Sequence, residues 1–198
     1  MDFESFPKIP RLSKDVVITE KIDGTNAGIY IDIHVGTEPK ETANVLPVQV
    51  ESDRWLMIKA ASRKRFVHPG NDNFGFAKWV WENADDLKRL SVGIYHGEWW
   101  GQGIQRRYGL EEKRFSLFNT NLWSDERGRR PECCHVVPVL YQGPYVDGVV
   151  DDCLDALLAN GSQAAKGFRD PEGVIMYHTA AKVMFKKTFD DEHKTEKE

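Results

Sequence analysis

The stretch ITEKIDGTNAGIYI, residues 18–31, places two alternating apolar runs on either side of an Asp23-Gly24 dipeptide. Alternation with a period of two is the pattern of a half-buried β-strand. Asp-Gly between two such runs is a strong short-range signal for a β-hairpin. The stretch therefore predicts strands at residues 16–22 and 27–33, joined by a tight turn, with Lys21 near the end of the first strand.

Length and composition predict an ordinary soluble protein with one domain. The chain has 198 residues, 40% of them hydrophobic and 29% charged, which is enough for one sizeable core. No apolar run approaches the roughly 20 residues that a membrane helix needs, and the first 14 residues lack the pattern of a signal peptide. Three cysteines make a poor disulfide framework and fit a reducing compartment. We therefore expect a cytoplasmic monomer without membrane association.

The charge is unevenly distributed along the chain. Residues 190–198 hold five acids and two lysines, so this stretch contributes −3 of the net charge of −4. The rest of the chain is nearly neutral and contains clusters of basic residues. These clusters are Arg63, Lys64 and Arg65; Arg106 and Arg107; Lys113 and Arg114; and Arg127, Arg129 and Arg130. Such clusters can neutralise phosphates, but solvated loops carry them as well, and composition alone does not separate the two interpretations.

The remaining periodicities indicate an α+β order. Further strands are predicted at residues 56–61, 91–99, 114–119, 172–178 and 181–187, the last two as a hairpin. Helices are predicted at residues 73–90 and 147–159, the second with Gly161 as its C-terminal cap. The segment 34–53 is polar and predicts an excursion, and residues 124–130 a charged loop. Because no repeat or low-complexity linker interrupts the chain, we expect a single domain over residues 1–189 and a flexible acidic tail over 190–198.

Lys21 is a candidate nucleophile. A lysine is a weak nucleophile while protonated, so covalent chemistry requires burial or a nearby cation that favours the neutral amine. The end of a strand that faces a pocket provides such a setting. The alternative is a lysine at the solvated rim of a hairpin, and a short Lys-x-Asp-Gly pattern does not exclude it.

Six short stretches follow one another in an order that resembles the covalent nucleotidyltransferases, which comprise ATP-dependent DNA and RNA ligases and mRNA capping enzymes. They are EKIDGTN (20–26), SRKRF (62–66), HGEWWGQGIQ (96–105), RFSLFN (114–119), EGVIM (172–176) and KVMFKK (182–187). The chain is most similar to the RNA-ligase branch of phage RNA-repair and RNA-editing ligases. The resemblance spans about residues 20–187 and implies an α+β nucleotidyltransferase (ATP-grasp-like) fold, with antiparallel sheets flanked by helices.

The resemblance implies a role for one residue in each stretch. Lys21 is expected to take AMP from ATP, and Arg63 to contact the ribose or a phosphate. Glu98 is expected to bind the ribose, Phe118 to stack on adenine and Lys186 to contact the α-phosphate as a second catalytic residue.

The resemblance also implies a divalent metal ion, Mg²⁺ or Mn²⁺, and further contacts to the nucleotide. Glu172 is expected to serve the metal or the nucleotide, with Asp23 as a second metal ligand. The remaining residues expected to bind the nucleotide are Glu20, Ile22, Asp23, Asn26 and Lys182.

The chain departs from the family pattern in several places. RNA-repair ligases often have histidine at the position of Asp23. The aspartate of this chain resembles the DNA-ligase and capping form of the motif. Met184 occupies a position where a lysine is usual, for which Lys182 or Lys187 could compensate, and Asn119 stands where aspartate is common. The chain ends soon after the last motif, so no additional C-terminal nucleic-acid-binding domain is expected, and a helper protein or domain could supply grip on the nucleic acid.

These observations predict an ATP-dependent RNA ligase that forms a lysyl-AMP, transfers AMP to a 5′-phosphate end and seals that end to a 3′-hydroxyl. RNA or DNA ends or nicks are the expected partners. An ATP-dependent DNA ligase, a GTP-dependent capping guanylyltransferase and a non-catalytic relic that binds nucleic-acid ends remain alternatives. For single residues the structural interpretations also stay open: Glu98 as a strand carboxylate, Phe118 as core, and Glu172 as the start of a strand.

Overall fold

The structure is a computed structural model that describes residues 3–123 and 130–191. The chain divides into two compact units, one made of Met1–Ile22 with Pro138–Glu198 and the other of Asp23–Val137. We call them unit 1 and unit 2. Residues 124–129 of the loop predicted at 124–130, and residues 192–198 of the tail predicted at 190–198, lie outside the described residues.

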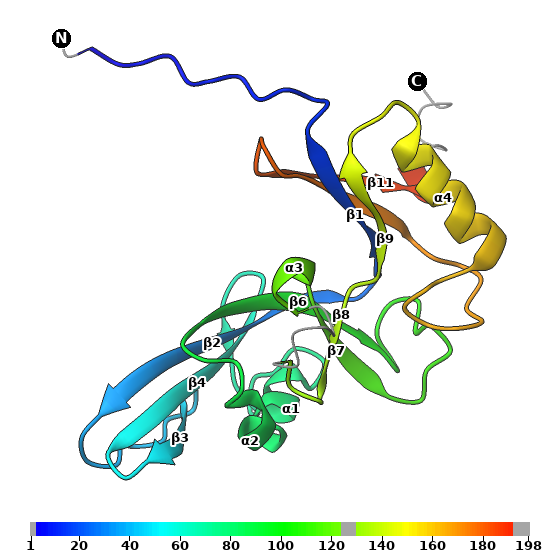
Figure 1. Cartoon of the computed structure of the whole chain (residues 1–198). Helices are drawn as coiled ribbons and strands as arrows, with labels where there is room; N and C mark the ends of the chain where they lie inside the picture. Colours follow the sequence, from blue (N-terminus) through cyan, green and yellow to red (C-terminus); the bar gives the residue numbers. More distant parts are fainter. Residues whose placement is uncertain (1–2, 124–129, 192–198) are drawn as a thin grey trace. The chain divides into compact units, whose positions relative to one another are not determined.

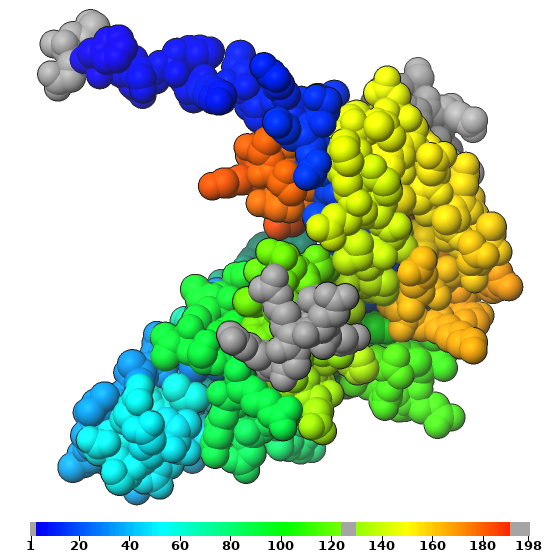
Figure 2. Space-filling view, in the orientation of Figure 1, coloured from blue at the N-terminus to red at the C-terminus, as the bar shows by residue number. Residues whose placement is uncertain are grey.

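Unit 1 is a four-stranded antiparallel sheet with one helix against it (Figure 1). Its elements are β1 (Asp15–Lys21), β9 (Val139–Pro144), α4 (Val149–Asn160), β10 (Gly173–His178), β11 (Val183–Thr188) and the short η2 (Phe189–Asp191). The strand order is β11-β10-β1-β9. One sheet face packs on α4 through Val16, Ile18, Val174, Met176, Val149, Cys153, Leu154 and Leu157. Helix α4, yellow in Figure 2, also carries three exposed acids, Asp151, Asp152 and Asp155.

The strand register of unit 1 sorts its charged residues onto two faces. Lys21 pairs with Gly173, and two residues along the sheet Thr19 pairs with Ile175, which in turn pairs with Lys186. Directly opposite residues share a face, and neighbouring residues along a strand alternate between faces. Lys21 and Lys186 therefore lie on the face that α4 does not cover.

Unit 2 is built on a seven-stranded sheet with the order β3-β4-β2-β6-β7-β8, to which β5 adds beside β4. Its strands are β2 (Thr25–Val35), β3 (Leu46–Glu51), β4 (Arg54–Ser62), β5 (Phe66–Val67), β6 (Gly93–Gly101), β7 (Lys113–Leu117) and β8 (Cys134–Val136). Its helices are α1 (Phe76–Glu82), α2 (Ala84–Leu87) and α3 (Thr120–Trp123). Its pairings are antiparallel except β7 with β8, which is parallel.

One face of the unit 2 sheet forms the larger core. Alternate strand residues such as Ala27, Ile29 and Ile58 are fully buried there, together with Phe76 and Val80 of α1. Four aromatic rings interlock at its centre, with centroids 5.1–5.9 Å apart. They belong to Phe76, Trp79, Trp99 and Phe115. The opposite face of this sheet, which we call the open face, carries the alternate residues of β2, β4, β6 and β7.

The predicted hairpin around Asp23-Gly24 is wrong. Strand β1 pairs with β10 and β9, whereas β2 pairs with β4 and β6, so the two strands belong to different sheets. The glycine serves close packing and not a hairpin turn. A Cβ on Gly24 would lie 2.5 Å from the Trp99 carbonyl oxygen and 2.7 Å from the Trp100 Cβ.

Most other predicted elements are confirmed, with shifted ends. The hairpin of β10 and β11 is present, and Gly161 caps α4 with a φ of 81° while its N–H donates to the Leu157 carbonyl. The single helix predicted at 73–90 is wrong, because Asn83 ends α1 with a φ of −107° before α2 begins. The 34–53 excursion contains β3, and no prediction covered β8, β9 or α3. Within the described residues, no helix is long and apolar enough to cross a membrane.

Candidate active site

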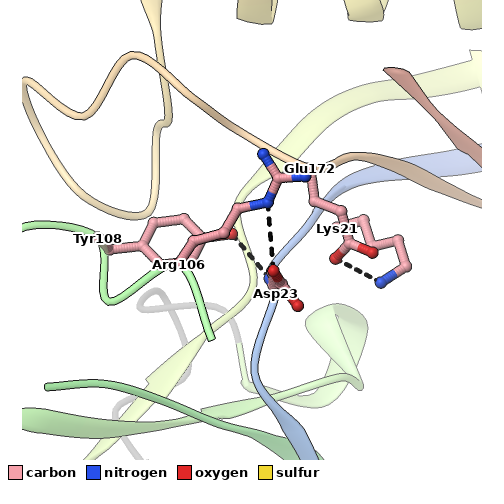
Figure 3. Close-up of polar contacts among 5 residues, drawn as sticks. All are labelled: Lys21, Asp23, Arg106, Tyr108 and Glu172. Atoms are coloured by element: carbon pink, nitrogen blue, oxygen red, sulfur yellow. Dashed lines mark hydrogen bonds and ion pairs between the residues drawn. The ribbon is translucent and has the colours of Figure 1, made fainter. Parts of the chain in front are cut away.

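Lys21 and Glu172 form an ion pair within unit 1. Lys21 is the last residue of β1, and Glu172 immediately precedes β10, whose first residue Gly173 pairs with Lys21. The Lys21 Nζ donates to the Glu172 Oε2 at 2.5 Å, with the two side chains 22% and 17% exposed (Figure 3). The Phe189 N–H donates to the Glu172 carbonyl at 3.2 Å. The pair is therefore fixed by the backbone at both partners.

The charge next to Lys21 is the opposite of the one expected. Sequence reasoning anticipated burial or a neighbouring cation that favours the neutral amine, but a carboxylate contacts Nζ. Lys21 lies on the sheet face that α4 does not cover, and a lysine acts as a nucleophile only as the neutral amine.

Glu20 points to the opposite face from Lys21 and holds a loop. Its side chain is 1% exposed. The Ser162 hydroxyl donates to Oε1 at 2.5 Å, and the Gln163 and Ala164 N–H groups donate to Oε2 at 2.7 and 2.9 Å. Burial raises the pKa of Glu20, and these three hydrogen bonds oppose the rise. The sequence predicts that Glu20 binds nucleotide. In the structure both of its carboxylate oxygens accept hydrogen bonds from the loop that follows α4.

Ile22 and Asp23 stand where the chain leaves unit 1 for unit 2. Ile22 is 4% exposed. The Asp23 Oδ2 accepts a hydrogen bond from the Arg106 Nε at 3.2 Å, and the Asp23 N–H donates to the Tyr108 hydroxyl at 2.7 Å (Figure 3). The sequence singled out Arg106 only as part of a basic loop and did not single out Tyr108, because each is more than 80 positions from Asp23.

The open face of unit 2 brings three predicted residues together. Asn26 of β2 pairs directly with Glu98 of β6, so the two side chains share this face. Phe118 follows β7, and its N–H donates to the His96 carbonyl of β6 at 3.0 Å. Phe118 is 37% exposed, whereas Leu117 is 1% exposed and belongs to the core. The core interpretation of Phe118, which the sequence left open, is therefore not supported by the structure, and Leu117 takes the core position.

Arg63 lies in the exposed turn between β4 and β5. The Ser62 N–H donates to the Arg65 carbonyl at 2.8 Å, which closes the turn. Ser62 pairs with Ala27 of β2, so the turn stands at the same end of the sheet as Asn26. The structure therefore places Arg63 at the edge of the group formed by Asn26, Glu98 and Phe118.

The three lysines of the last motif occupy different places. Lys186 is exposed and shares the uncovered face of unit 1 with Lys21. Lys187 points to the other face, where it pairs with Asp151 of α4. Lys182 lies in the turn after His178, at the far end of β10 from Gly173. His178 is five residues from Gly173, which at the ordinary strand rise is about 16 Å. The structure brings Lys186 to the Lys21 side of the sheet and does not bring Lys182 or Lys187 there.

The two residues predicted to bind metal are each paired with a cation. Glu172 contacts Lys21, and Asp23 contacts Arg106. Among residues 3–123 and 130–191, no group of three or more His, Cys, Asp or Glu side chains is arranged to hold a metal ion. A Glu172-bound ion would therefore take most of its ligands from water and substrate oxygens, which is the usual way in which Mg²⁺ is held.

A family model described as RNA ligase matches residues 14–189 of the chain. The fold is similar to solved structures of an RNA ligase from Naegleria gruberi. A variant with AMP and manganese is 16% identical, with a TM-score of 0.57 over 94% of this chain and 53% of that chain. Another variant, with ATP and manganese, is 16% identical, with a TM-score of 0.55 over 93% and 52%.

The Naegleria gruberi ligase with pyrophosphate is 17% identical, with a TM-score of 0.56 over 93% of this chain and 52% of that chain. At such identities the likeness shows a shared fold. The chain spans about half the length of these solved ligases. No curated protein sequence matches the chain.

Proposed function

This chain belongs to the RNA ligase family, and from that premise we propose that it is an ATP-dependent RNA ligase with a nucleotidyltransferase fold and Lys21 as its nucleophile. The observation that carries the proposal is the position of Lys21. It ends a strand on a sheet face that α4 leaves uncovered, in contact with Glu172 and on the same face as Lys186.

In the first step the Lys21 amine attacks the α-phosphorus of ATP. An N–P bond forms, the bond from that phosphorus to the bridging oxygen of the β-phosphate breaks, and pyrophosphate leaves. Nζ must lose a proton in this step, and the Glu172 carboxylate is an acceptor already within hydrogen-bonding distance. Lys186 supplies positive charge on the same face, where charge develops on the α-phosphate.

The open face of unit 2 supplies the groups for recognition of the nucleotide. Phe118 presents a partly exposed ring on which adenine stacks. Glu98 accepts hydrogen bonds from the ribose hydroxyls, and Asn26 beside it can donate or accept. Arg63 contacts the ribose or a phosphate from the turn at the same end of the sheet. Naegleria gruberi RNA ligase has been solved with ATP and with AMP, which supports this choice of nucleotide.

A divalent metal ion fits the carboxylate chemistry of Glu172. One oxygen of Glu172 contacts Lys21, and the second is a hard ligand of the kind that Mg²⁺ and Mn²⁺ prefer. Asp23 suits a metal less well, because Arg106 already neutralises it. When bound, such an ion supplies charge neutralisation at the triphosphate.

The later steps transfer AMP to RNA and seal the strand. The 5′-phosphate end attacks the lysyl-AMP phosphorus, the N–P bond breaks, and Lys21 is regenerated. A 3′-hydroxyl then attacks the activated 5′-phosphorus, and AMP leaves. Three further properties stay predictions: that the ligase is a cytoplasmic monomer, that it works in RNA repair, and that it uses a helper protein.

The test is labelling of the chain with ATP that carries ³²P at the α-phosphate, in the presence of Mg²⁺ or Mn²⁺, followed by denaturing electrophoresis. Wild-type protein should retain the label and Lys21→Ala should retain none. Lys88→Ala is the matched control, because Lys88 also forms an ion pair, with Asp85 at 2.7 Å. Equal labelling of Lys21→Ala would overturn the nucleophile, and labelling from GTP alone would point to a capping enzyme. Sealing of RNA against DNA ends then tests the substrate.

A further inference from the structure

Phe74 in unit 2 has an unusual backbone conformation and an exposed ring. Its φ is 52°, in the left-handed region that a bulky side chain rarely adopts. Its side chain is 52% exposed, so core packing does not account for the conformation. Non-glycine residues held in this region are strained, and such residues cluster at functional sites.

Surrounding hydrogen bonds impose this conformation on Phe74. Its carbonyl accepts from the Trp99 Nε1 at 3.1 Å and from the Lys113 Nζ at 2.7 Å. The preceding residue, Asn73, donates from Nδ2 to the Thr25 hydroxyl at 3.1 Å. Asp72 accepts from three backbone N–H groups, two of which lie in the first turn of α1. The ring is therefore displayed from a rigid loop and not from a mobile one.

The loop that carries Phe74 has polar and cationic partners. Lys113 lies against its carbonyl, and a lysine ammonium has two further protons to donate. Arg65 donates to the Asn71 side chain at 2.9 Å, which joins the Phe74 loop to the basic turn at residues 63–65. Thr25, which holds Asn73, is the neighbour of Asn26 at the start of β2. The loop is thus tied to β2 on the face opposite to the proposed nucleotide-binding face, beside Trp99.

We propose that Phe74 stacks on a base of the RNA strand, while Lys113 and the basic turn at residues 63–65 contact its phosphates. This inference rests on the proposed function. Single-stranded RNA is recognised by stacking of its bases on aromatic side chains within a cationic surface. A protein partner would instead need a contiguous apolar patch, whereas the three residues that precede Phe74 and the lysine on its carbonyl are polar: Asn71, Asp72, Asn73 and Lys113.

The test measures binding of a fluorescent, 5′-phosphorylated single-stranded RNA oligonucleotide to the full chain by anisotropy. Phe74→Ala and Phe74→Leu should weaken binding by about 5-fold to 150-fold, the range for one stacked base, and Phe74→Trp should restore it. Phe185→Ala is the matched control, because Phe185 is 55% exposed but lies in unit 1. Lys113→Gln should lower the salt dependence by about one phosphate contact.

Phe74→Gly separates a role in binding from a role in structure. Glycine adopts a positive φ without strain, so this variant should keep or raise the midpoint of thermal unfolding while it weakens RNA binding. Unchanged RNA affinity in Phe74→Ala and Phe74→Leu would overturn the inference. Equal affinity of the Leu and Trp variants would do the same, because the aromatic face would then have no effect.

Lysyl-AMP formation is measured on the same preparations. If wild-type protein forms no lysyl-AMP but binds RNA through Phe74, the proposed function fails and this inference stands. If lysyl-AMP forms and RNA affinity is indifferent to Phe74, only this inference fails.

Discussion

Substitution of Glu20 tests whether its loop needs a buried hydrogen-bond acceptor or a buried charge. Glu20 is 1% exposed and accepts three hydrogen bonds, from Ser162, Gln163 and Ala164, at 2.5–2.9 Å. Glu20→Ala leaves the buried Ser162 hydroxyl and the partly exposed Gln163 and Ala164 N–H groups without this acceptor, at up to about 1–3 kcal/mol each before relaxation. We expect the free energy of unfolding to fall by about 3–5 kcal/mol.

Glu20→Gln should cost far less, within about 1 kcal/mol of wild type. The glutamine amide oxygen can accept from the Gln163 and Ala164 N–H groups, as Oε2 does now. Its NH₂ group can donate to the oxygen of the Ser162 hydroxyl, which in wild type donates to Oε1. The neutral amide also avoids the cost of burying a charge, which is the cause that raises the pKa of Glu20.

The pH dependence follows from the sign of that shift. The ordinary pKa is 4.5, and the folded value is higher, so the folded chain binds this proton more tightly than the unfolded chain does. The contribution of Glu20 to the free energy of unfolding is therefore complete below pH 4.5 and is lost as the pH rises through the raised pKa. Glu20→Gln should lack this loss.

Urea unfolding of the three proteins at a series of pH values is the assay. Glu82→Ala is the control, because Glu82 is 59% exposed and pairs with Lys78 at 3.6 Å. Such surface pairs contribute about 0–1 kcal/mol, so this control should unfold close to wild type. The reasoning is refuted if Glu20→Gln is as damaging as Glu20→Ala, because the loop would then require the charge itself.

Four further substitutions test the sites described above. Glu172→Gln removes the counter-charge of Lys21, and we expect lysyl-AMP formation to slow at least about tenfold, equivalent to about 1.4 kcal/mol in the barrier. Labelling with α-labelled ATP measures this rate, and an unchanged rate would contradict the role of Glu172. Gly24→Ala places a Cβ 2.5 Å from the Trp99 carbonyl oxygen, so the free energy of unfolding, measured by thermal unfolding, should fall by about 1–3 kcal/mol. Wild-type stability would contradict the close packing of Gly24 against Trp99. Lys186→Ala should lower the rate of labelling from α-labelled ATP at least about tenfold. Lys187→Ala should not, because Lys187 points to the α4 face. The reverse result would contradict the strand register.

Local patterns predicted much of the strand content, and nonlocal pairing explains where they failed. Alternation located most of β1, β2 and β6, because a buried face imposes a period of two on the sequence. The hairpin at Asp23-Gly24 failed because a dipeptide reports only local turn propensity. The pairing of β1 with β10, which joins residues more than 150 positions apart, decides which sheet β1 enters.

The site shows the same division. Its candidate residues could be identified from short motifs, but the sequence did not decide whether Phe118 faces the core, which the structure shows it does not. The partner of Lys21 could not be derived, because Glu172 lies 151 residues away and only the register of two strands brings them together. The choice of Lys186 over Lys187 likewise depends on which face of β11 each one occupies.

The most direct test of the central claim is peptide mapping after incubation of the folded wild-type chain with ATP and Mn²⁺ or Mg²⁺. We predict that mass spectrometry finds AMP on the peptide that contains Lys21, attached at its Nζ. A chain that carries no such adduct with any nucleoside triphosphate, or that carries it on a different lysine, would contradict the account.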